Sequence, residues 1–264
     1  MTKDQNILEL NTAMMRNTYK IKGEDSLGSC FVIGKPFKKD PARACFVLVT
    51  AAHVLEQMKG EDATIYVRKK QNDDSFTKIP FGIKIRQGTN PLWVKNKSDI
   101  DVATMYVNLP KDLDIQLLST PTFANDKILN AFEIHSGDEM FCLGFPFGAE
   151  ANEAGFPILR SDKVASFPLT PTQKNQSFLL DFQVFRGNSG GPVYFVESNR
   201  NYAGGTRIGL KIQFIAGLVS KESSITETIK SLYETKQQIH PLGLAIIIHA
   251  SHILDTINQL PERE

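Results

Sequence analysis

Short apolar runs bounded by turn-forming residues extend through most of this chain. Clusters of Gly, Pro, Asn and Asp separate the runs, which is the pattern of β-strands joined by turns. The runs form two sets on either side of a segment at 108–127 that contains Pro110 and Pro121. The first set lies at 28–33, 45–49, 64–67, 81–85 and 102–107, and the second at 140–143, 163–166, 178–182, 193–195, 212–219 and 243–248. We therefore predict an all-β fold with two six-stranded antiparallel β-barrels.

Helical spacing of apolar residues occurs near both ends of the chain and once inside it. At the N-terminus it covers residues 4–15, and at the C-terminus Ser251 is a predicted N-cap for a helix with one apolar face. Between 220 and 243, the spacing of Ile225, Ile229, Leu232 and Tyr233 predicts a helical insertion over 225–237. The predicted parts are a helix and lead-in strand at 1–27, a first barrel at 28–110, a linker at 111–127, a second barrel at 128–250 and a helix and tail at 251–264.

The segment RGNSGGP at 186–192 places Ser189 among glycines directly after an apolar, strand-like run. A serine hydroxyl is a weak nucleophile unless the backbone exposes it and directs amide hydrogens at the oxygen that forms during attack. Glycines permit that bend. By itself, such a run is equally compatible with a flexible turn, so a base and an orienting acid are needed as well.

Both groups occur upstream. The buried-strand pattern ACFVLVTAA at 44–52 ends at His53, and the segment SDIDVATM at 98–105 offers two acids. Asp99 and Asp101 lie on the same face of an extended segment because side chains alternate along it. We prefer Asp101, because it directly precedes small and apolar residues. Singly, His53 could be a structural histidine and Asp101 a solvated acid; the order His, Asp, Ser favours a catalytic set.

At this point the chain resembles the chymotrypsin-fold serine peptidases, and among them the bacterial HtrA-like (trypsin-like) branch. The motifs are TAAHV at 50–54, DVA at 101–103, GDEMFCLGFPFG at 137–148 and GNSGGP at 187–192, with a weaker match in GLAI at 243–246. The resemblance spans roughly residues 28–258. It implies a serine endopeptidase that acts through an acyl-enzyme intermediate, with no cofactor or metal and with protein or peptide substrates. The alternative is a catalytically silent relative that binds peptides in the cleft between the barrels.

The resemblance also implies a role for each matching residue. His53 is the base, Asp101 orients it, Ser189 is the nucleophile, and the amides of Gly187 and Ser189 form the oxyanion hole. Substrate backbone is expected to pair with the strand at 217–222, so that Ser220, Lys221 and Glu222 flank the primary pocket. Gln183 takes the place of the acid at the pocket base of trypsin-type enzymes, and Gly243 falls on the opposite wall. We expect a small or medium apolar residue at the cleaved bond, although Glu222 at the pocket rim could attract a basic one.

Other features of the resemblance concern regulation and assembly. The loop that matches 225–237 borders the primary pocket in relatives, so a helix there either gates the pocket or covers the barrel end. The tail is too short for an appended PDZ domain. Residues 1–20 either mediate homo-oligomerisation, as an N-terminal segment does in some relatives, or pack on their own barrel. His249 and His252 lack the further ligands of a zinc site.

Composition agrees with these expectations. The 264 residues suffice for a sizeable core, and 30 basic against 29 acidic residues give a net charge of +1, which disfavours nucleic acid as a partner. The basic runs at 38–39 and 68–70 are expected to be solvated hairpin ends. The polar N-terminus and the lack of a long apolar stretch show no signal peptide or membrane span, so a cytoplasmic location is the default. Cys30, Cys45 and Cys142 are expected to be buried thiols, with a Cys30–Cys45 bridge as the rival reading.

Overall fold

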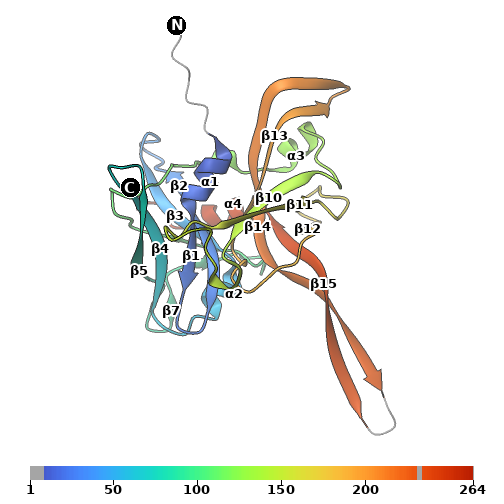
Figure 1. The fold of residues 1–264 in the computed structure, drawn as a ribbon, viewed down its shortest axis with the longest axis horizontal. Coiled ribbons are helices and arrows are strands. Elements are labelled where there is room, and N and C mark those ends of the chain that lie inside the picture. Colours follow the sequence, from blue (N-terminus) through green and yellow to red (C-terminus); the bar gives the residue numbers. More distant parts are fainter. Residues whose placement is uncertain (1–8, 231–233, 264) are drawn as a thin grey trace.

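The computed structural model describes residues 9–230 and 234–263, without the side chains of 201, 206–210 and 230. Within this part of the chain, the strands form a seven-stranded sheet, a six-stranded sheet and a small ribbon (Figure 1). The prediction of two barrel-like β-units is therefore confirmed. The N-terminal sheet has seven strands instead of six, because the predicted lead-in strand joins it as β1 between β2 and β4 and the short β8, which was not predicted, adds beside β9.

The N-terminal sheet has the order β5-β4-β1-β2-β3-β9-β8. Its strands are β1 (Thr18–Lys22), β2 (Leu27–Pro36), β3 (Ala44–Thr50), β4 (Asp62–Lys70), β5 (Phe76–Lys84), β8 (Val94–Lys95) and β9 (Ala103–Tyr106), and β6 (Arg86–Gln87) pairs with β7 (Asn90–Pro91) in the ribbon. β4 shows why these residues form strands: Ala63, Ile65 and Val67 are buried on one face. The intervening Thr64 and Tyr66 are only half-buried, so the sequence alternates as a sheet with one inner face requires.

The C-terminal sheet has the order β11-β10-β13-β14-β15-β12. Its strands are β10 (Glu139–Gly144), β11 (Ile158–Lys163), β12 (Ser177–Leu180), β13 (Pro192–Tyr202), β14 (Gly205–Lys230) and β15 (Thr235–His249). A bridge between Val164 and Leu180 joins the end of β11 to β12 and closes the sheet into a barrel. The strand expected at 163–166 thus lies earlier in the chain, and only its first residue belongs to β11.

Four α-helices and two 3-10 turns lie outside the strands of the described chain: α1 (Leu10–Asn17), α2 (Ala52–Glu56), α3 (Asp126–Ala131), α4 (Ala250–Asn258), η1 (Thr120–Thr122) and η2 (Pro146–Gly148). α1 confirms part of the N-terminal helix, buries Leu10 and Met14, and begins after Glu9, whose carboxylate accepts the Thr12 N–H at 2.7 Å. The expected residues 4–8 lie outside the described chain. No helix described here has the length and apolar character needed to cross a bilayer.

The C-terminal helix starts two residues earlier than an N-cap at Ser251 predicts, and Ser251 is not its N-cap. β15 runs directly into α4, so that His249 takes the capping position without a side-chain hydrogen bond. Ile253 and Ile257 are fully buried on the face that packs against the rest of the chain. Because the strand leads into the helix without a loop, its end rather than a capping side chain sets where α4 begins.

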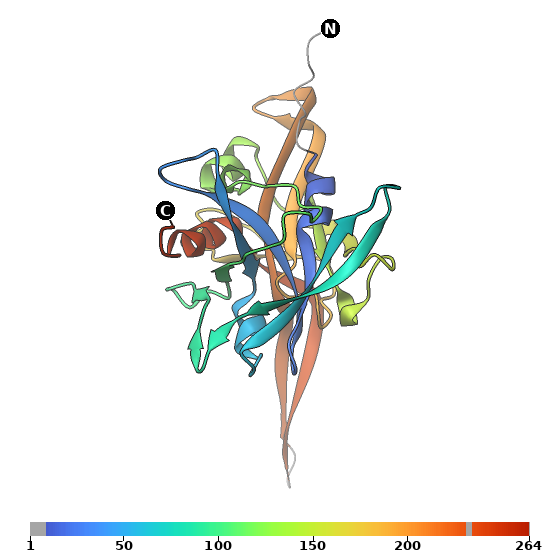
Figure 2. The same cartoon turned by 90° about the vertical axis from the view of Figure 1, so that its left-hand side faces the viewer.

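The predicted helical insertion at 225–237 is wrong. β14 continues to Lys230 and β15 begins at Thr235, and the two pair from Ser224–Pro241 to Lys230–Thr235. They form a two-stranded arm, defined here as residues 223–230 and 234–241, which extends away from the body of the molecule (Figures 1 and 2). Leu232 and Tyr233, which contributed to the helical spacing, lie outside the described residues. β-branched Ile225, Thr226 and Ile229 favour the strand.

Arg68 is not the solvated hairpin end that its basic run predicts. It is completely buried. Its guanidinium donates to the carbonyl oxygens of Met15, Arg16 and Thr18 at 2.8–3.1 Å and to that of Gly155 at 2.8 Å. It also lies 4.6 Å from the ring centre of Tyr19. Arg68 therefore ties α1 and β1 to the first barrel, while its neighbours Lys69 and Lys70 remain near the surface.

All three cysteines are free thiols. Cys30 and Cys45 lie on paired strands, but the register places Cys45 opposite Lys35, five residues from Cys30, so the alternative of a bridge between them is wrong. Cys142 is buried in β10, and its burial raises the pKa of the thiol to about 12. Such thiols pack as small apolar side chains.

Candidate active site

His53 lies where β3 turns into α2. The last residues of β3, from Val47 to Thr50, are buried, and the chain enters α2 through Ala51, so His53 lies in the first helical turn. Its side chain remains 31% exposed, whereas the flanking Ala52 and Val54 are buried. The buried neighbours fix the backbone and leave the imidazole accessible from solvent.

Asp101 lies in the turn before β9 and contacts His53 twice. Its Oδ2 is 2.8 Å from His53 Nδ1, and its Oδ1 accepts the His53 backbone N–H at 3.0 Å. Ser220 Oγ donates to the same Oδ2 at 2.5 Å. The alternative acid, Asp99, has a positive φ of 57° and an exposed side chain that pairs with Lys95. The structure thus brings Asp101, and not Asp99, to His53.

Asp101 is ionised at neutral pH. Burial raises the pKa of its carboxyl group, but the hydrogen bonds and the charge of His53 and the hydrogen bond from Ser220 outweigh burial and lower this pKa to about 2. An ionised carboxylate can only accept a hydrogen bond, so it favours the neutral imidazole that carries its proton on Nδ1 and leaves Nε2 free as an acceptor.

The loop around Ser189 packs against the segment that leads to His53. A Cβ on Gly190 would lie 2.2 Å from Thr50 Oγ1 and 3.0 Å from the backbone nitrogen of Ala51. The Ser189 carbonyl accepts the Ser29 N–H at 2.8 Å. Only a residue without a side chain fits at position 190, which explains the glycine there and brings the Ser189 loop of the second barrel against the His53 segment of the first.

Two amides in this loop remain available to a ligand. The Arg186 carbonyl accepts the Phe147 N–H at 2.6 Å, and because a trans peptide directs its C=O and N–H to opposite sides, the Gly187 N–H faces away from that contact. Gly187 has a φ of 98°, which favours glycine. Within the described chain, neither the Gly187 amide nor the Ser189 amide donates to another protein group. Both can therefore donate to a developing negative charge.

A groove of about 550 Å³ borders His53 and Asp101. Ser220 and Lys221 line it from β14, and Ile246 and Ile248 line it from β15. Of the other residues expected to bind substrate, Glu222 adjoins Lys221 on β14, and its Oε1 is buried without a hydrogen-bond partner in the described chain. The groove therefore runs from the histidine along the outer face of the sheet.

Gln183 and Gly243 do not line this groove. Gln183 is exposed, and its backbone carbonyl accepts from the Arg160 guanidinium at 2.6 Å. Gly243 lies in β15 near the base of the arm, has a φ of 70° and would have open space around a Cβ. Their assignment to the primary pocket stays a prediction.

Comparison with known families identifies the domain. The sequence profile of the trypsin-like peptidase domain matches residues 28–200, which includes His53, Asp101 and Ser189. The chain belongs to the trypsin-like peptidase domain family. No curated protein sequence matches it significantly. The HtrA-like subtype stays a prediction.

Solved structures align with this trypsin-like domain over most of its length. An inactive mutant form of Rv3671c from M. tuberculosis H37Rv aligns over 96% of this chain and 92% of its own, with a TM-score of 0.50 and 15% identity. The protease Anisep from Arthrobacter nicotinovorans aligns over 92% of this chain and 94% of its own, with a TM-score of 0.47 and 13% identity. At 15% identity, the likeness to Rv3671c concerns the fold alone.

Ser29 is a residue of the trypsin-like domain that sequence reasoning missed. It is completely buried in β2, where its Oγ donates to the Gly187 carbonyl at 2.6 Å and accepts the Phe145 N–H at 3.2 Å. Its own N–H donates to the Ser189 carbonyl at 2.8 Å, so Ser29 holds the Ser189 loop at both Gly187 and Ser189. In the sequence, Ser29 is one polar residue in a strand-like run, and nothing there indicates partners 158 residues away.

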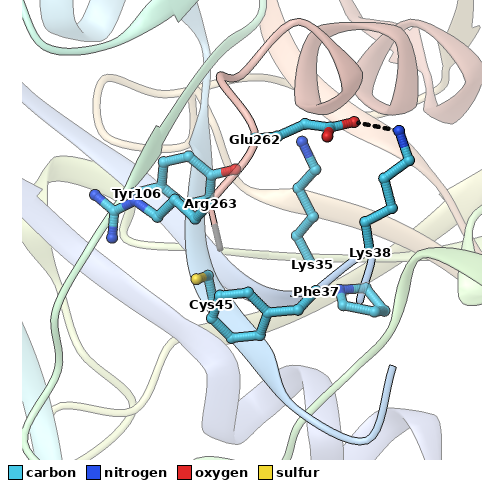
Figure 3. A pocket seen from close by; sticks show the side chains of 8 residues that line it. Lys35, Phe37, Lys38, Cys45, Tyr106, Glu262 and Arg263 are labelled. Atoms are coloured by element: carbon cyan, nitrogen blue, oxygen red, sulfur yellow. Dashed lines mark hydrogen bonds and ion pairs between the residues drawn. The ribbon is translucent and has the colours of Figure 1, made fainter. Parts of the chain in front are cut away.

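A second, smaller hollow of about 50 Å³ shares no residue with the His53 groove (Figure 3). Lys35 lies in it and donates from Nζ to the carbonyl oxygens of Ile257 and Leu260 at 3.1 and 3.3 Å, and Lys38 pairs with Glu262 at 3.2 Å. These contacts satisfy carbonyl groups at the C-terminal end of α4. The hollow therefore serves to attach α4 to the first barrel of the trypsin-like domain.

Proposed function

We propose that this trypsin-like domain is a serine endopeptidase that uses His53, Asp101 and Ser189 as a catalytic triad. The observation that carries the proposal is the double contact of Asp101 with the ring and the backbone of His53, next to which the Ser189 loop packs. A module that only binds peptides needs neither an ionised acid on a solvent-accessible histidine nor two unpaired amides beside a serine.

The proposed reaction has two stages. Ser189 Oγ attacks the substrate carbonyl carbon while its proton moves to His53 Nε2, and the oxyanion accepts from the amides of Gly187 and Ser189. Asp101 stabilises the imidazolium that forms. His53 then gives the proton to the leaving amine, which breaks the peptide bond and leaves an acyl group on Ser189. Water, deprotonated by His53, attacks the acyl carbon and releases the acid and the free serine.

The substrate backbone is proposed to pair with β14 at 220–222. β13 pairs with β14 only up to Pro192–Leu218, and the last backbone bonds on that edge join Gly190 and Gly191 to Val219. The edge is open from Ser220 onward, directly beside Ser220's contact with Asp101. An extended peptide placed there lies alongside Ser189.

Labelling by a fluorophosphonate probe tests the proposal. We expect the wild type to be labelled at Ser189. Ser189→Ala should abolish labelling, and Ser198→Ala, which changes an exposed serine on β13, should retain it. A folded wild type that binds peptides but is never labelled would instead support a catalytically silent peptide-binding module.

A further inference from the structure

The open edge of β14 does not stop at the residues beside Ser189. From Ser220 to the end of the strand, the edge that β13 occupied earlier has no strand partner among the described residues. β15 occupies only the opposite edge. The arm therefore continues, along the same strand, the edge on which the substrate is proposed to pair, although the register with β15 shifts between Val219 and Lys221 and again between Glu222 and Ser224. At about 3.3 Å per residue, the stretch 220–229 is roughly 33 Å long.

The direction of a bound peptide follows from the sheet. β13 is antiparallel to β14 and leads away from Ser189 as it pairs with residues before Leu218. A peptide that takes the place of β13 on the later part of β14 is antiparallel as well, so its N-terminal end lies toward the tip of the arm. Residues that precede the cleaved bond thus follow the arm outward.

The arm also presents the right peptide groups on this edge. Pro241 has no N–H, so its pair with Ser224 is a non-hydrogen-bonded pair, in which the peptide groups of both residues face outward. Alternation then turns the peptide groups of Ser224, Thr226 and Thr228 toward the open edge of β14. On the edge of β15, the same alternation leaves Pro241 without a donor, which makes that edge a poorer partner.

Apolar side chains add a recognition surface. Ile225 is 56% exposed and Ile229 is 45% exposed, and both lie on one face of the arm with Glu227, which pairs with His240 at 3.0 Å. Ile239 is 68% exposed on the other face. Exposed aliphatic side chains on a two-stranded ribbon bury little apolar surface against the ribbon itself. They bury more when a third strand pairs with the ribbon, and so they stabilise that strand.

We propose that the arm is an extended substrate-binding edge, on which an unfolded segment N-terminal to the cleaved bond adds as a third β-strand. This inference rests on the proposed function. The substrate class is a polypeptide that can present about eight extended residues before the cleaved bond, with β-branched or apolar side chains opposite Ile225 and Ile229. Strand addition of this kind derives affinity from main-chain hydrogen bonds.

A peptide length series tests the arm. Cleavage sites are mapped by mass spectrometry on an unfolded test protein, and internally quenched peptides are made around one site with three, six or nine residues before the cleaved bond. We expect kcat/KM to rise by at least about tenfold from the shortest to the longest peptide, since two or more net hydrogen bonds of about 1 kcal/mol each are gained beyond residue 222.

Proline substitutions on the two edges provide a matched pair. Thr226→Pro removes an N–H that faces the open edge of β14, and Ile239→Pro removes the N–H of the residue paired with Thr226, which faces the other edge. We expect Thr226→Pro to reduce the rise in kcat/KM with peptide length about tenfold. Ile239→Pro should leave this rise unchanged. Thr226→Val, which retains the N–H, should behave as the wild type. Circular dichroism and thermal melting check that each variant is folded.

The possible outcomes separate the arm from the active site. Cleavage that is independent of peptide length overturns the arm proposal and leaves the proposed function intact, because short peptides are still cut. If Thr226→Pro and Ile239→Pro reduce the effect of peptide length equally, the proposal that the peptide pairs with the edge of β14 is overturned. If the arm instead joins two copies of the chain, Thr226→Pro changes the mass in solution and leaves the length series unchanged, which also overturns the proposal. Lack of cleavage at every length overturns both.

Discussion

Asp101 holds His53 by ring and backbone together, with its Oδ2 2.8 Å from Nδ1 and its Oδ1 3.0 Å from the backbone nitrogen. Two contacts from one carboxylate fix both the orientation of the imidazole and the position of the helix that carries it. The carboxylate itself is held by Ser220 from the second barrel. The carboxylate that holds His53 in the first barrel therefore also links this barrel to β14 of the second.

Asp101→Asn should lower kcat for peptide cleavage by roughly 10⁴-fold, because an amide can donate to Nδ1 and thereby favour the tautomer whose Nε2 carries the proton. Ser220→Ala removes one donor to the same oxygen and should cost no more than about tenfold. Steady-state kinetics on a quenched peptide measure both. Retention of more than a tenth of the activity in Asp101→Asn would show that Asp101 does not orient the base.

Ser29→Ala should affect both stability and turnover. It leaves the Gly187 carbonyl and the Phe145 N–H unpaired in a buried site, which costs about 1–3 kcal/mol of unfolding free energy. The loosened Gly187 should lower kcat by about tenfold or more with little change in KM. Ser26→Ala is the control, because the hydroxyl of buried Ser26 donates to the Val54 carbonyl and forms no hydrogen bond to the Ser189 loop in the described chain. Equal kinetics in the two variants would contradict a positioning role for Ser29.

Gly187→Ala should lower kcat by about 100- to 1000-fold, the usual result of losing one oxyanion donor. The added Cβ would lie 2.1 Å from the Phe145 carbonyl oxygen, so the loop must shift. Gly137→Ala provides the matched control: its φ of 93° is close to the 98° of Gly187, but a Cβ there meets open space. Both substitutions strain the backbone at a positive φ, so urea unfolding should show a similar loss of unfolding free energy in the two variants. Only Gly187→Ala should lose peptidase activity.

The sequence was sufficient to predict site residues where the adjacent residues restrict the local backbone to one kind of structure. The strand before His53, the small residues after Asp101 and the glycines around Ser189 each restrict local backbone geometry, so the predicted site residues could be chosen before the structure. The first barrel was also predicted well, because runs such as that of β4 alternate in burial. These are local signals, and local signals are what a single sequence carries.

Long-range contacts were not predictable in the same way. Ser29 and Arg68 are polar residues in apolar runs, and their roles depend on carbonyl groups that the fold brings from distant segments. The arm was mistaken for a helix because Ile225 and Ile229 satisfy a spacing of four as well as a spacing of two. Only pairing with β15 decides between these periods, and the pairing partner is not visible in the periodicity of β14 itself.

His249 should make the fold less stable in acid. It is 1% exposed, its ring centre lies 4.8 Å from that of Phe178, and its Nε2 has no hydrogen-bond partner in the described chain. Burial, together with the smaller effect of the nearby His252, lowers the pKa of this histidine to about 4, and Asp126 only partly opposes this shift. Between about pH 6.5 and pH 4 the unfolded chain binds a proton at this position that the folded chain does not, so the unfolding free energy falls as the pH decreases through this range and levels off below it.

The size of the effect is roughly 3 kcal/mol over the whole range, at about 1.4 kcal/mol per pKa unit. His249→Gln, which does not titrate, should remove this part of the pH dependence. Urea unfolding of the wild type and of the variant at pH 7 and pH 4.5 gives the test, because the difference between the two proteins cancels the titration of the carboxylates that they share. If both lose the same stability between these pH values, His249 is not the group responsible. Glu9 does not account for such a loss, because its pKa is about 2 in the folded chain and its contribution is lost only below about pH 4.5.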